Sequence, residues 1–477
     1  MWIMAQKGRL LSNIVILGIS TAISKLAVFL MMPLYTANLA PAAFGTVEIL
    51  INTAVLLMPL ASLGVPEAVF RFVAGGENEY NVRAVGRKLL WLGLGLFFII
   101  LPFLWLFEVL RPYLLYLGVY VFLSVLHSYY AHVLRAEGEY LVYAIRQLFC
   151  TLVMVALASM FLTVWNLGVI GYLMAVFIAD GVTALLIALY LFLRREKTVE
   201  KVEEHPNLFP AILRYALPLV PTAMLWWSLG YFDRYILLTF HGDVTVGLYA
   251  AAGKLPALLT FAAGIFLEAW HFSAIKEREE KRGERFDQMY GVLLPLLCFT
   301  VALMMLFSRP IVQRIFAPEY AGAARFVPFW ALATLFSALS SFLGSVYVVK
   351  LRSGASFLTA LFGAVVNIVL VLLLVPPLGA DGAVLATLVS YVTLFLWRIW
   401  HCRTILYFHG RMHQLVLSVI CLLVIGGGVL SGHMLLAVIC TPLTLLPFGH
   451  DIKAGIRFLR QTVEVFLQKA TKKKKRY

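Results

Sequence analysis

About fourteen apolar stretches, each roughly 18 to 25 residues long, fill most of this sequence and restrict the folds open to it. A helix rises about 1.5 Å per residue, so such a stretch can cross a hydrocarbon layer of roughly 30 Å. Charged residues make up only 13% of the 477 residues, whereas hydrophobic residues make up 62%. We therefore predict an all-α polytopic membrane protein of about 14 transmembrane helices. The expected spans are residues 10–35, 44–66, 87–107, 113–134, 142–164, 168–193, 212–240, 244–272, 288–308, 326–349, 355–377, 382–400, 412–431 and 433–449.

The positions of the basic residues predict the orientation, because cytoplasmic loops hold an excess of Lys and Arg. With the N-terminus inside, most of the 39 Lys and Arg residues fall on cytoplasmic segments. The expected outer connections carry only Arg111, Arg309, Arg314 and Arg325. An even number of spans then places both termini in the cytoplasm.

One pattern occurs twice along the chain. Pro41-Ala42-Ala43-Phe44-Gly45 opens an apolar run that closes at Glu67, and Asp243-Val244-Thr245-Val246-Gly247 opens one that closes at Glu268. A duplicated helical bundle in a membrane predicts two lobes around a site between them, a plan that many transporters share.

The charged stretch of residues 194–205 marks the expected boundary between the copies. We predict an N-terminal six-helix lobe at residues 1–207 and a pseudo-symmetric C-terminal six-helix lobe at 208–408. Residues 409–477 have no counterpart in the first copy, and we expect two extra transmembrane helices there, followed by a basic cytoplasmic tail.

Several classes of function are disfavoured by the sequence. The net charge of +15 is spread over the expected inner loops, so contact with anionic membrane lipids explains it better than a nucleic-acid partner does. The stretch from Gly247 to Leu255 differs from a P-loop in its glycine spacing and in the residue after the lysine. The cysteines and histidines, His127 among them, show no compact metal-ligand spacing. We expect no cofactor, no metal and no catalytic residue, and hence a transporter rather than an enzyme.

A few ionisable residues lie inside the expected spans, where each costs about 2.5 to 3.5 kcal/mol on insertion scales and usually faces a cavity or a partner. We interpret Lys25, Arg234 and Lys254 as positive charges offered to an anionic ligand. Asp233 and Lys254 lie at similar distances from the turn at residues 241–243. In the alternative interpretation they neutralise each other and hold two helices in register.

Other charged residues are candidates for coupling or gating, as is Asp233. Asp180 lies near the middle of its span and could bind a proton or sodium, or cap a polar contact between helices. Glu48 is the nearest acid to Lys25 in depth but lies several residues nearer the outer face. Glu67 and Glu268 occupy matching repeat positions, and Arg71 follows Glu67 by one turn; a gate and an ordinary interfacial ion pair both fit.

Short motifs that recur in one family occur in order along the chain. They are Ser24-Lys25, Pro33-Leu34-Tyr35-Thr36, Phe44-Gly45, Asp233-Arg234-Tyr235-Ile236-Leu237, Val246-Gly247-Leu248-Tyr249, Lys254-Leu255 and Phe316-Ala317-Pro318-Glu319-Tyr320-Ala321-Gly322-Ala323-Ala324. Together they resemble the bacterial polysaccharide-lipid flippases. These form the polysaccharide transporter branch of the multidrug/oligosaccharidyl-lipid/polysaccharide exporter superfamily.

This resemblance implies an alternating-access flippase in the bacterial inner membrane. Its cargo would be an undecaprenyl-diphosphate-linked oligosaccharide, moved to the outer leaflet for assembly of a cell-surface polysaccharide such as O-antigen, lipopolysaccharide or exopolysaccharide. Lys25, Arg234 and Lys254 would contact the diphosphate or an acidic sugar. Coupling to H+ or Na+ and a polysaccharide polymerase partner are further expectations.

Two alternatives stay open. A MATE-type cation-coupled drug antiporter shares the same fold but would predict a mostly acidic and aromatic cavity. A membrane enzyme, such as a sugar polymerase or glycosyltransferase, would predict a large outer loop or clustered catalytic carboxylates.

Overall fold

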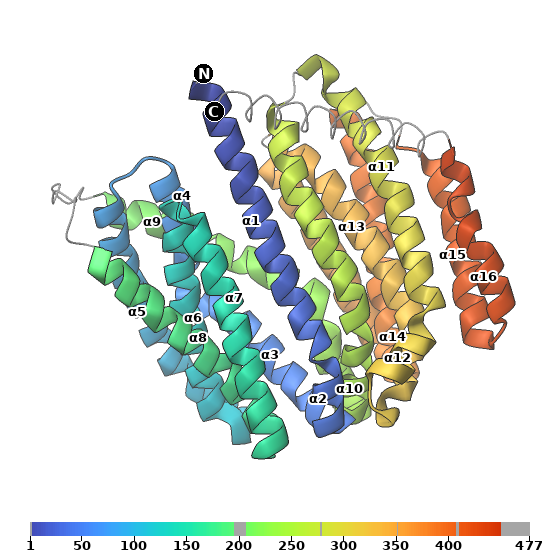
Figure 1. Ribbon diagram of the computed structural model, residues 1–477, viewed down its shortest axis with the longest axis horizontal. Helices are drawn as coiled ribbons and strands as arrows, with labels where there is room; N and C mark the ends of the chain where they lie inside the picture. Colours follow the sequence, from blue (N-terminus) through green and yellow to red (C-terminus); the bar gives the residue numbers. More distant parts are fainter. Residues whose placement is uncertain (1, 195–206, 277–278, 351, 407–409, 450–477) are drawn as a thin grey trace, which may run out of the picture. The chain divides into compact units, whose positions relative to one another are not determined.

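The described part of the computed structural model covers residues 2–194, 207–276, 279–350, 352–406 and 410–449 and contains helices without strands (Figure 1). The N-terminal helices are α1 (Trp2–Leu30), α2 (Met32–Asn38), α3 (Pro41–Ser62), α4 (Val65–Ala74), α5 (Glu79–Ile100), η1 (Leu101–Leu106), η2 (Arg111–Tyr113), α6 (Leu114–Ala136), α7 (Tyr140–Ser159), η3 (Met160–Val164) and α8 (Gly168–Leu193). The remaining helices are α9 (Leu208–Ala216), α10 (Leu219–Lys276), α11 (Glu279–Leu306), α12 (Ser308–Ile315), η5 (Pro318–Arg325), α13 (Val327–Val349), α14 (Ser353–Ile405), α15 (Met412–Ser431), α16 (Met434–Leu443) and η6 (Leu446–Phe448). The basic tail predicted at the C-terminal end lies outside the described residues.

Eleven helical segments of the described residues are long and apolar enough to cross a membrane. Two of them have about twice the length of a single span, because α10 and α14 each consist of two helices joined at a kink. The kinks lie at Gly242 (φ 77°) and Gly379 (φ 59°). Positive φ is costly for residues with a Cβ atom, so glycine permits both kinks. Counting each kinked helix as two spans and adding the shorter apolar segment Met434–Phe448 brings the eleven to fourteen. The prediction of a polytopic all-α protein of about 14 helices is confirmed.

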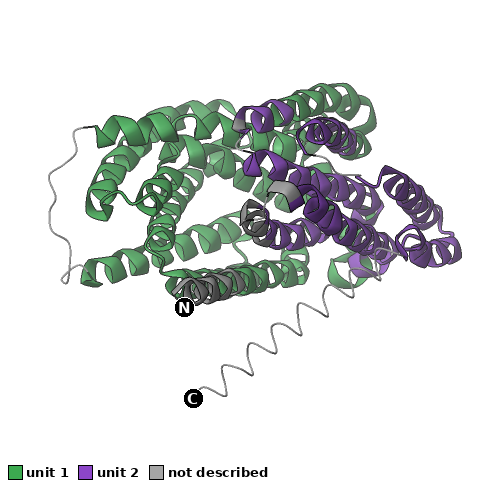
Figure 2. Ribbon diagram, turned by 90° about the horizontal axis from the view of Figure 1, so that it is seen from above, with its two compact units in different colours: residues 1–254, 313–322, 360–387 green, residues 255–312, 323–359, 388–477 purple. Residues whose placement is uncertain are grey.

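The helices form two compact units, which Figure 2 distinguishes by colour. Unit 1 comprises residues 1–254, 313–322 and 360–387, and unit 2 comprises residues 255–312, 323–359 and 388–477. In unit 1, α1 packs against α7 and α6 packs against α8; in unit 2, α11 packs against α13 and α15. The units do not coincide with the lobes expected from the repeat, so the lobe boundaries at 207 and 408 stay a prediction.

The two landmark glycines of the sequence repeat touch each other's helices in unit 1. A Cβ atom placed on Gly247 of α10 would lie 1.8 Å from the carbonyl oxygen of Pro41 in α3. One placed on Gly45 would lie 2.2 Å from the carbonyl oxygen of Asp243. The first turns of α3 and of the second half of α10 therefore meet backbone to backbone, at a distance that only glycine allows.

A segment distant in sequence covers this crossing. The Tyr320 hydroxyl donates a hydrogen bond to the Leu39 carbonyl oxygen (2.7 Å), and the Ala317 amide donates to Thr36 Oγ1 (3.0 Å). The Tyr320 ring meets Phe44 edge-on with centroids 6.0 Å apart, and burial raises the pKa of Tyr320 above its ordinary value. Three of the motifs quoted above therefore meet at one place in unit 1.

The glycine contact gives a stability prediction. Gly247→Ala should lower the stability of the protein by about 3 kcal/mol, because backbone atoms cannot move aside for the added methyl group. Gly230→Ala in the same helix is the matched control, since no atom lies within 4 Å of its added Cβ. Thermal unfolding of both variants in detergent provides the measurement. A Gly247→Ala variant that melts together with the control would contradict the crossing.

Candidate functional site

Glu48 of α3 and Lys254 of α10 form an ion pair at the crossing. The Lys254 Nζ lies 2.5 Å from Glu48 Oε1 and 5.7 Å from the centre of the Phe44 ring. The Glu48 side chain is buried, whereas about one third of the Lys254 side chain is exposed. Lys254 can therefore bind a second anion while it stays paired with Glu48.

The local sequence explains why these two charges meet. Glu48 follows Gly45 by three residues, and Lys254 follows Gly247 by seven. Residues three and seven positions apart share a helix face, so each charge lies on the face that its glycine presents to the other helix. The close approach of the glycines brings both side chains into reach.

Asp233 and Arg234 form a buried neutral pair in the first half of α10. The Asp233 carboxylate accepts hydrogen bonds from the hydroxyl groups of Tyr249 and Thr387 and from the Arg234 amide. The Arg234 Nη1 lies 3.6 Å from Asp233 Oδ1 and donates to the Gly230 carbonyl oxygen (2.7 Å). Each charge of this pair is therefore compensated by the other residue and by neighbouring polar groups.

Of the two interpretations of Asp233 and Lys254, the one in which they neutralise each other is wrong. Both residues lie in unit 1, but Lys254 binds Glu48, and Asp233 binds Tyr249, Thr387 and Arg234. Equal depth in a hairpin does not specify the direction of a side chain around its helix axis, and the two side chains take different partners.

Lys25, the Glu48–Lys254 pair and the Asp233–Arg234 pair are treated together as one group of charges in unit 1. Within this group, Lys25 is the cation that no carboxylate neutralises. Its side chain is exposed on α1 and forms no ion pair with a described residue. It lies close enough to Lys254 for the two ammonium groups to repel each other. Three cations and two carboxylates leave this group with one net positive charge, which Lys25 carries.

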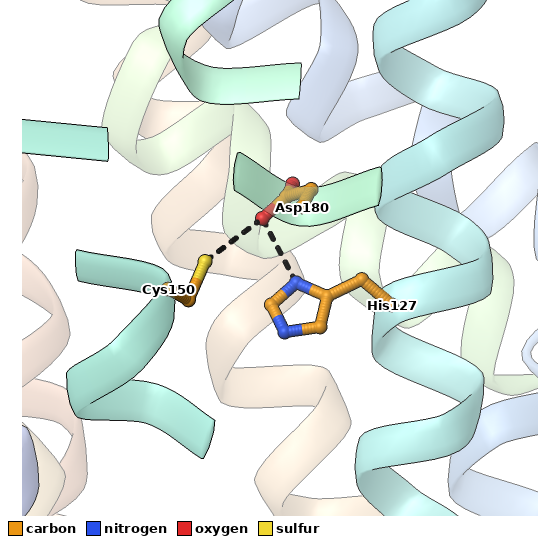
Figure 3. A group of neighbouring side chains, drawn as sticks. All are labelled: His127, Cys150 and Asp180. Atoms are coloured by element: carbon orange, nitrogen blue, oxygen red, sulfur yellow. Dashed lines mark hydrogen bonds and ion pairs between the residues drawn. The ribbon is translucent and has the colours of Figure 1, made fainter. Parts of the chain in front are cut away.

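Asp180 of α8 belongs to a second polar cluster, which it forms with α6 and α7 (Figure 3). Its Oδ1 lies 2.8 Å from His127 Nδ1 and 3.5 Å from Cys150 Sγ, and its Oδ2 accepts a hydrogen bond from Ser124. On the other side of the ring, His127 Nε2 lies 2.7 Å from Arg146 Nη1. A charged row of Arg146, His127 and Asp180 therefore runs through otherwise apolar helices.

The protonation of His127 follows from its neighbours. A guanidinium donates hydrogen bonds and never accepts them, so His127 Nε2 must accept from Arg146. His127 is therefore neutral and donates its Nδ1 proton to Asp180. His127, Cys150 and Asp180 could offer three ligand atoms to a metal, all within 4.8 Å of one another. The direct His127–Asp180 hydrogen bond and the adjacent Arg146 guanidinium disfavour a cation at this place.

Two of the gating candidates, Glu67 and Arg71, lie in the short helix α4, and Glu268 lies in α10. Glu67 and Arg71 of α4 are both exposed, and no ion pair joins them in the described structure. Glu67 lines a cavity of about 440 Å³ in unit 1, together with residues of α3, α6 and α10. The side chain of Glu268 lies outside the described residues.

The turn between α6 and α7 carries ion pairs that sequence reasoning missed. Arg83 contacts Glu79 and Glu137, and Arg194 Nη1 lies 2.6 Å from Glu139 Oε1. Burial raises the pKa of Glu137 even though Arg83 lies against it. These pairs join α5, α8 and the α6–α7 turn at one end of the bundle.

The partners of Asp180 were also missed. The sequence carried a signal for them: Ser124 and His127 are three residues apart, and Arg146 and Cys150 are four residues apart. Each pair therefore lies on one face of an apolar helix. Arg146 lies only four residues after the predicted start of its span at residue 142, where a basic residue ordinarily indicates the end of a span.

Solved structures show which fold this is. The chain matches a structure described as the lipid II flippase MurJ in an inward closed conformation, with 14% identity, a TM-score of 0.67 and coverage of 92% of this chain and 99% of that one. It also matches inward-facing and outward-facing structures of a multidrug resistance MATE family transporter of the MOP superfamily. The inward-facing match has 18% identity and a TM-score of 0.65, and it covers 80% of this chain and 98% of that one. The outward-facing match has 19% identity and a TM-score of 0.59, and it covers 82% of this chain and 96% of that one. This protein is thus a multi-pass membrane protein with the fold of the MOP-superfamily transporters.

The family follows from the sequence itself. A family model described as "Polysaccharide biosynthesis protein" matches residues 10–270, more than half of the chain, and the protein belongs to this family. None of the curated proteins compared with the chain matches it. The resemblance drawn from the short motifs is confirmed.

The ion pair at the crossing can be tested by a double-mutant cycle. Glu48→Gln and Lys254→Gln should show a coupling energy of about 1 to 2 kcal/mol in thermal or denaturant unfolding, because each change removes the other's partner. Asp233→Asn combined with Lys254→Gln is the control cycle and should be close to additive. A larger coupling in the control cycle would restore the rejected Asp233–Lys254 pair.

Proposed function

We propose that this protein is an alternating-access flippase. It moves an undecaprenyl-diphosphate-linked oligosaccharide from the cytoplasmic to the outer leaflet, where the sugar is used to assemble a cell-surface polysaccharide. The single observation that carries the proposal is the excess positive charge of Lys25 beside the Glu48–Lys254 pair, in the apolar helices of a polysaccharide biosynthesis family member. Such a charge is costly in a membrane and is compensated when an anion arrives.

The chemistry of the cargo matches this site. Its diphosphate and sugar head would lose many hydrogen bonds to water in a bare hydrocarbon layer, whereas its prenyl tail dissolves there. A flippase therefore needs to shield only the head. The ammonium groups of Lys25 and Lys254 supply mobile point charges for the diphosphate, and Lys254 can turn from Glu48 toward a phosphate oxygen.

Arg234 has a different place in this proposal. Its guanidinium is buried and compensated by Asp233, so a contact with the diphosphate or an acidic sugar requires a conformation in which the pair opens. In the form described, Asp233 compensates the charge of Arg234. Lys25 is the first contact for an incoming anion.

The fold supports alternation between two open forms, since related structures are described as inward-facing and outward-facing. The alternative function, a MATE-type cation-coupled drug antiporter, rests on the same fold. It would need a site that attracts cations, whereas the group around Lys25 carries net positive charge. The anionic lipid-linked cargo is therefore favoured.

We propose that protons drive the cycle through Asp180. When His127 gains a second proton, its Nε2 can no longer accept from Arg146, and the contact between α6 and α7 through these residues breaks. Proton uptake thereby changes the packing of the helices around Asp180. Glu67, Arg71 and Glu268 are proposed to act at the cytoplasmic mouth.

The cellular setting completes the proposal. We place the protein in the bacterial inner membrane with both termini in the cytoplasm, as the distribution of Lys and Arg predicts. A polysaccharide polymerase would receive the translocated lipid-linked sugar. The protein itself performs no covalent chemistry on its cargo.

Lys25→Ala should slow flipping of a lipid-linked oligosaccharide roughly tenfold, because it removes one charge-assisted contact with the diphosphate. Thermal stability should stay near the wild-type value, since Lys25 is exposed and has no ion-pair partner among the described residues. Flipping is measured in proteoliposomes by accessibility of the sugar to an added reagent. Lys281→Ala, which removes an exposed lysine of α11, is the control. Equal rates for both variants would exclude Lys25 as a cargo contact.

Asp180→Asn should abolish the response of flipping to an imposed pH gradient, because a neutral amide removes the negative charge that stabilises a second proton on His127. The measurement compares proteoliposomes with and without a pH difference across the membrane. Asp243→Asn, at the kink of α10, is the matched control and should respond as the wild type does. A response that survives in Asp180→Asn would place the coupling elsewhere.

A further inference from the structure

Arg398 is a buried cation whose contacts are all with neutral groups. It lies in the second half of α14, within unit 2, and its side chain is 2% exposed. Its Nε donates to Thr359 Oγ1 (3.1 Å) and its Nη1 donates to the Ser340 carbonyl oxygen (2.7 Å). The guanidinium carbon lies 5.9 Å from the centre of the Tyr347 ring. No carboxylate pairs with Arg398 among the described residues.

The ionisable neighbours of Arg398 do not supply the missing negative charge. The Tyr347 hydroxyl shares a hydrogen bond with His401 Nδ1 (2.9 Å), and the Cys402 thiol donates to the Leu343 carbonyl oxygen (3.4 Å). A phenol and a thiol carry no negative charge near pH 7, and an imidazole side chain does not supply one. A guanidinium buried in an apolar helix bundle therefore keeps an uncompensated positive charge, a costly arrangement unless an anion joins it.

An independent observation shows where an anion would sit. Ser340 Oγ is buried without a hydrogen-bond partner, although the carbonyl group of the same residue binds Arg398. Buried hydroxyl groups nearly always have a hydrogen-bond partner. The Ser340 hydroxyl group is therefore available to donate a hydrogen bond to a bound ligand. One turn further along α13, Gly344 lets the guanidinium lie directly against this helix, because a Cβ atom there would lie 2.9 Å from Arg398 Nη1. A buried charge without a carboxylate and a buried hydroxyl group without a partner are thus both found where Arg398 packs on α13.

We propose that unit 2 holds a small anion of the halide class, such as chloride, between the Arg398 guanidinium and the Ser340 hydroxyl. The anion neutralises Arg398 and accepts the hydrogen bonds that these groups do not otherwise make. Both residues are almost fully buried, and this burial favours a monatomic ion without its water shell over a phosphate. The site links α13 to α14, and it stands independently of the proposed cargo site in unit 1.

The first test measures thermal unfolding of the full-length protein in detergent, with sodium chloride replaced stepwise by sodium gluconate at constant ionic strength. An anion that binds only the folded state raises the melting temperature in a saturable way as its concentration rises. Sodium bromide should act as chloride does. The wild type should show this dependence, Ser340→Ala should need more chloride for the same rise, and Arg398→Gln should not respond.

Arg314→Gln removes an exposed arginine of α12 and should keep the full chloride response. Arg398→Gln also removes two hydrogen bonds and could fail to fold, so a second measurement uses the wild type alone. Crystals grown in bromide should show an anomalous peak within contact distance of Arg398 and Ser340. A melting temperature independent of chloride, an unchanged response in Arg398→Gln, or bromide bound elsewhere without a peak at Arg398 would each overturn the proposal.

Discussion

The backbone contact between Gly45 and Gly247 is the constraint on which the rest of unit 1 depends. It brings the first turns of α3 and of the second half of α10 together at a distance that no other residue permits. Glu48 and Lys254 reach each other because both lie on the faces that meet there. Tyr320 then covers the crossing by binding Leu39 and packing on Phe44. The duplicated motif of the sequence is thus also a contact between its own two copies.

Sequence reasoning predicted the apolar spans well because lipid imposes a length and a polarity on every segment that crosses it. It also located the turn at Gly242, where a charged and glycine-containing tripeptide interrupts two apolar runs. It failed where the answer depends on rotation about a helix axis. Glu48 and Lys254 are 206 residues apart, and only the crossing of their helices reveals them as partners. Arg398 lies two residues before the predicted end of its span at residue 400, where a basic residue does not indicate a buried charge.

The two units use charge in different ways. Unit 1 contains two compensated ion pairs and Lys25, whose charge no carboxylate of these pairs compensates. The charge of Lys25 is therefore available to a ligand. The row of Arg146, His127 and Asp180 can change its charge with pH and therefore suits coupling. In unit 2, Arg398 is enclosed and its charge acts on the local packing of α13 and α14. In an apolar helix bundle an ionisable group is costly, so it usually either pairs with another group or takes part in function.

The central claim is that the positive group around Lys25 selects a lipid that carries a diphosphate. Native mass spectrometry of the purified protein, mixed with equal amounts of undecaprenyl diphosphate and undecaprenol, measures this selection directly. The account predicts that the wild type retains mainly the diphosphate lipid and that Lys25→Glu loses this preference. Equal retention of both lipids by the wild type, or an unchanged preference in Lys25→Glu, would contradict it.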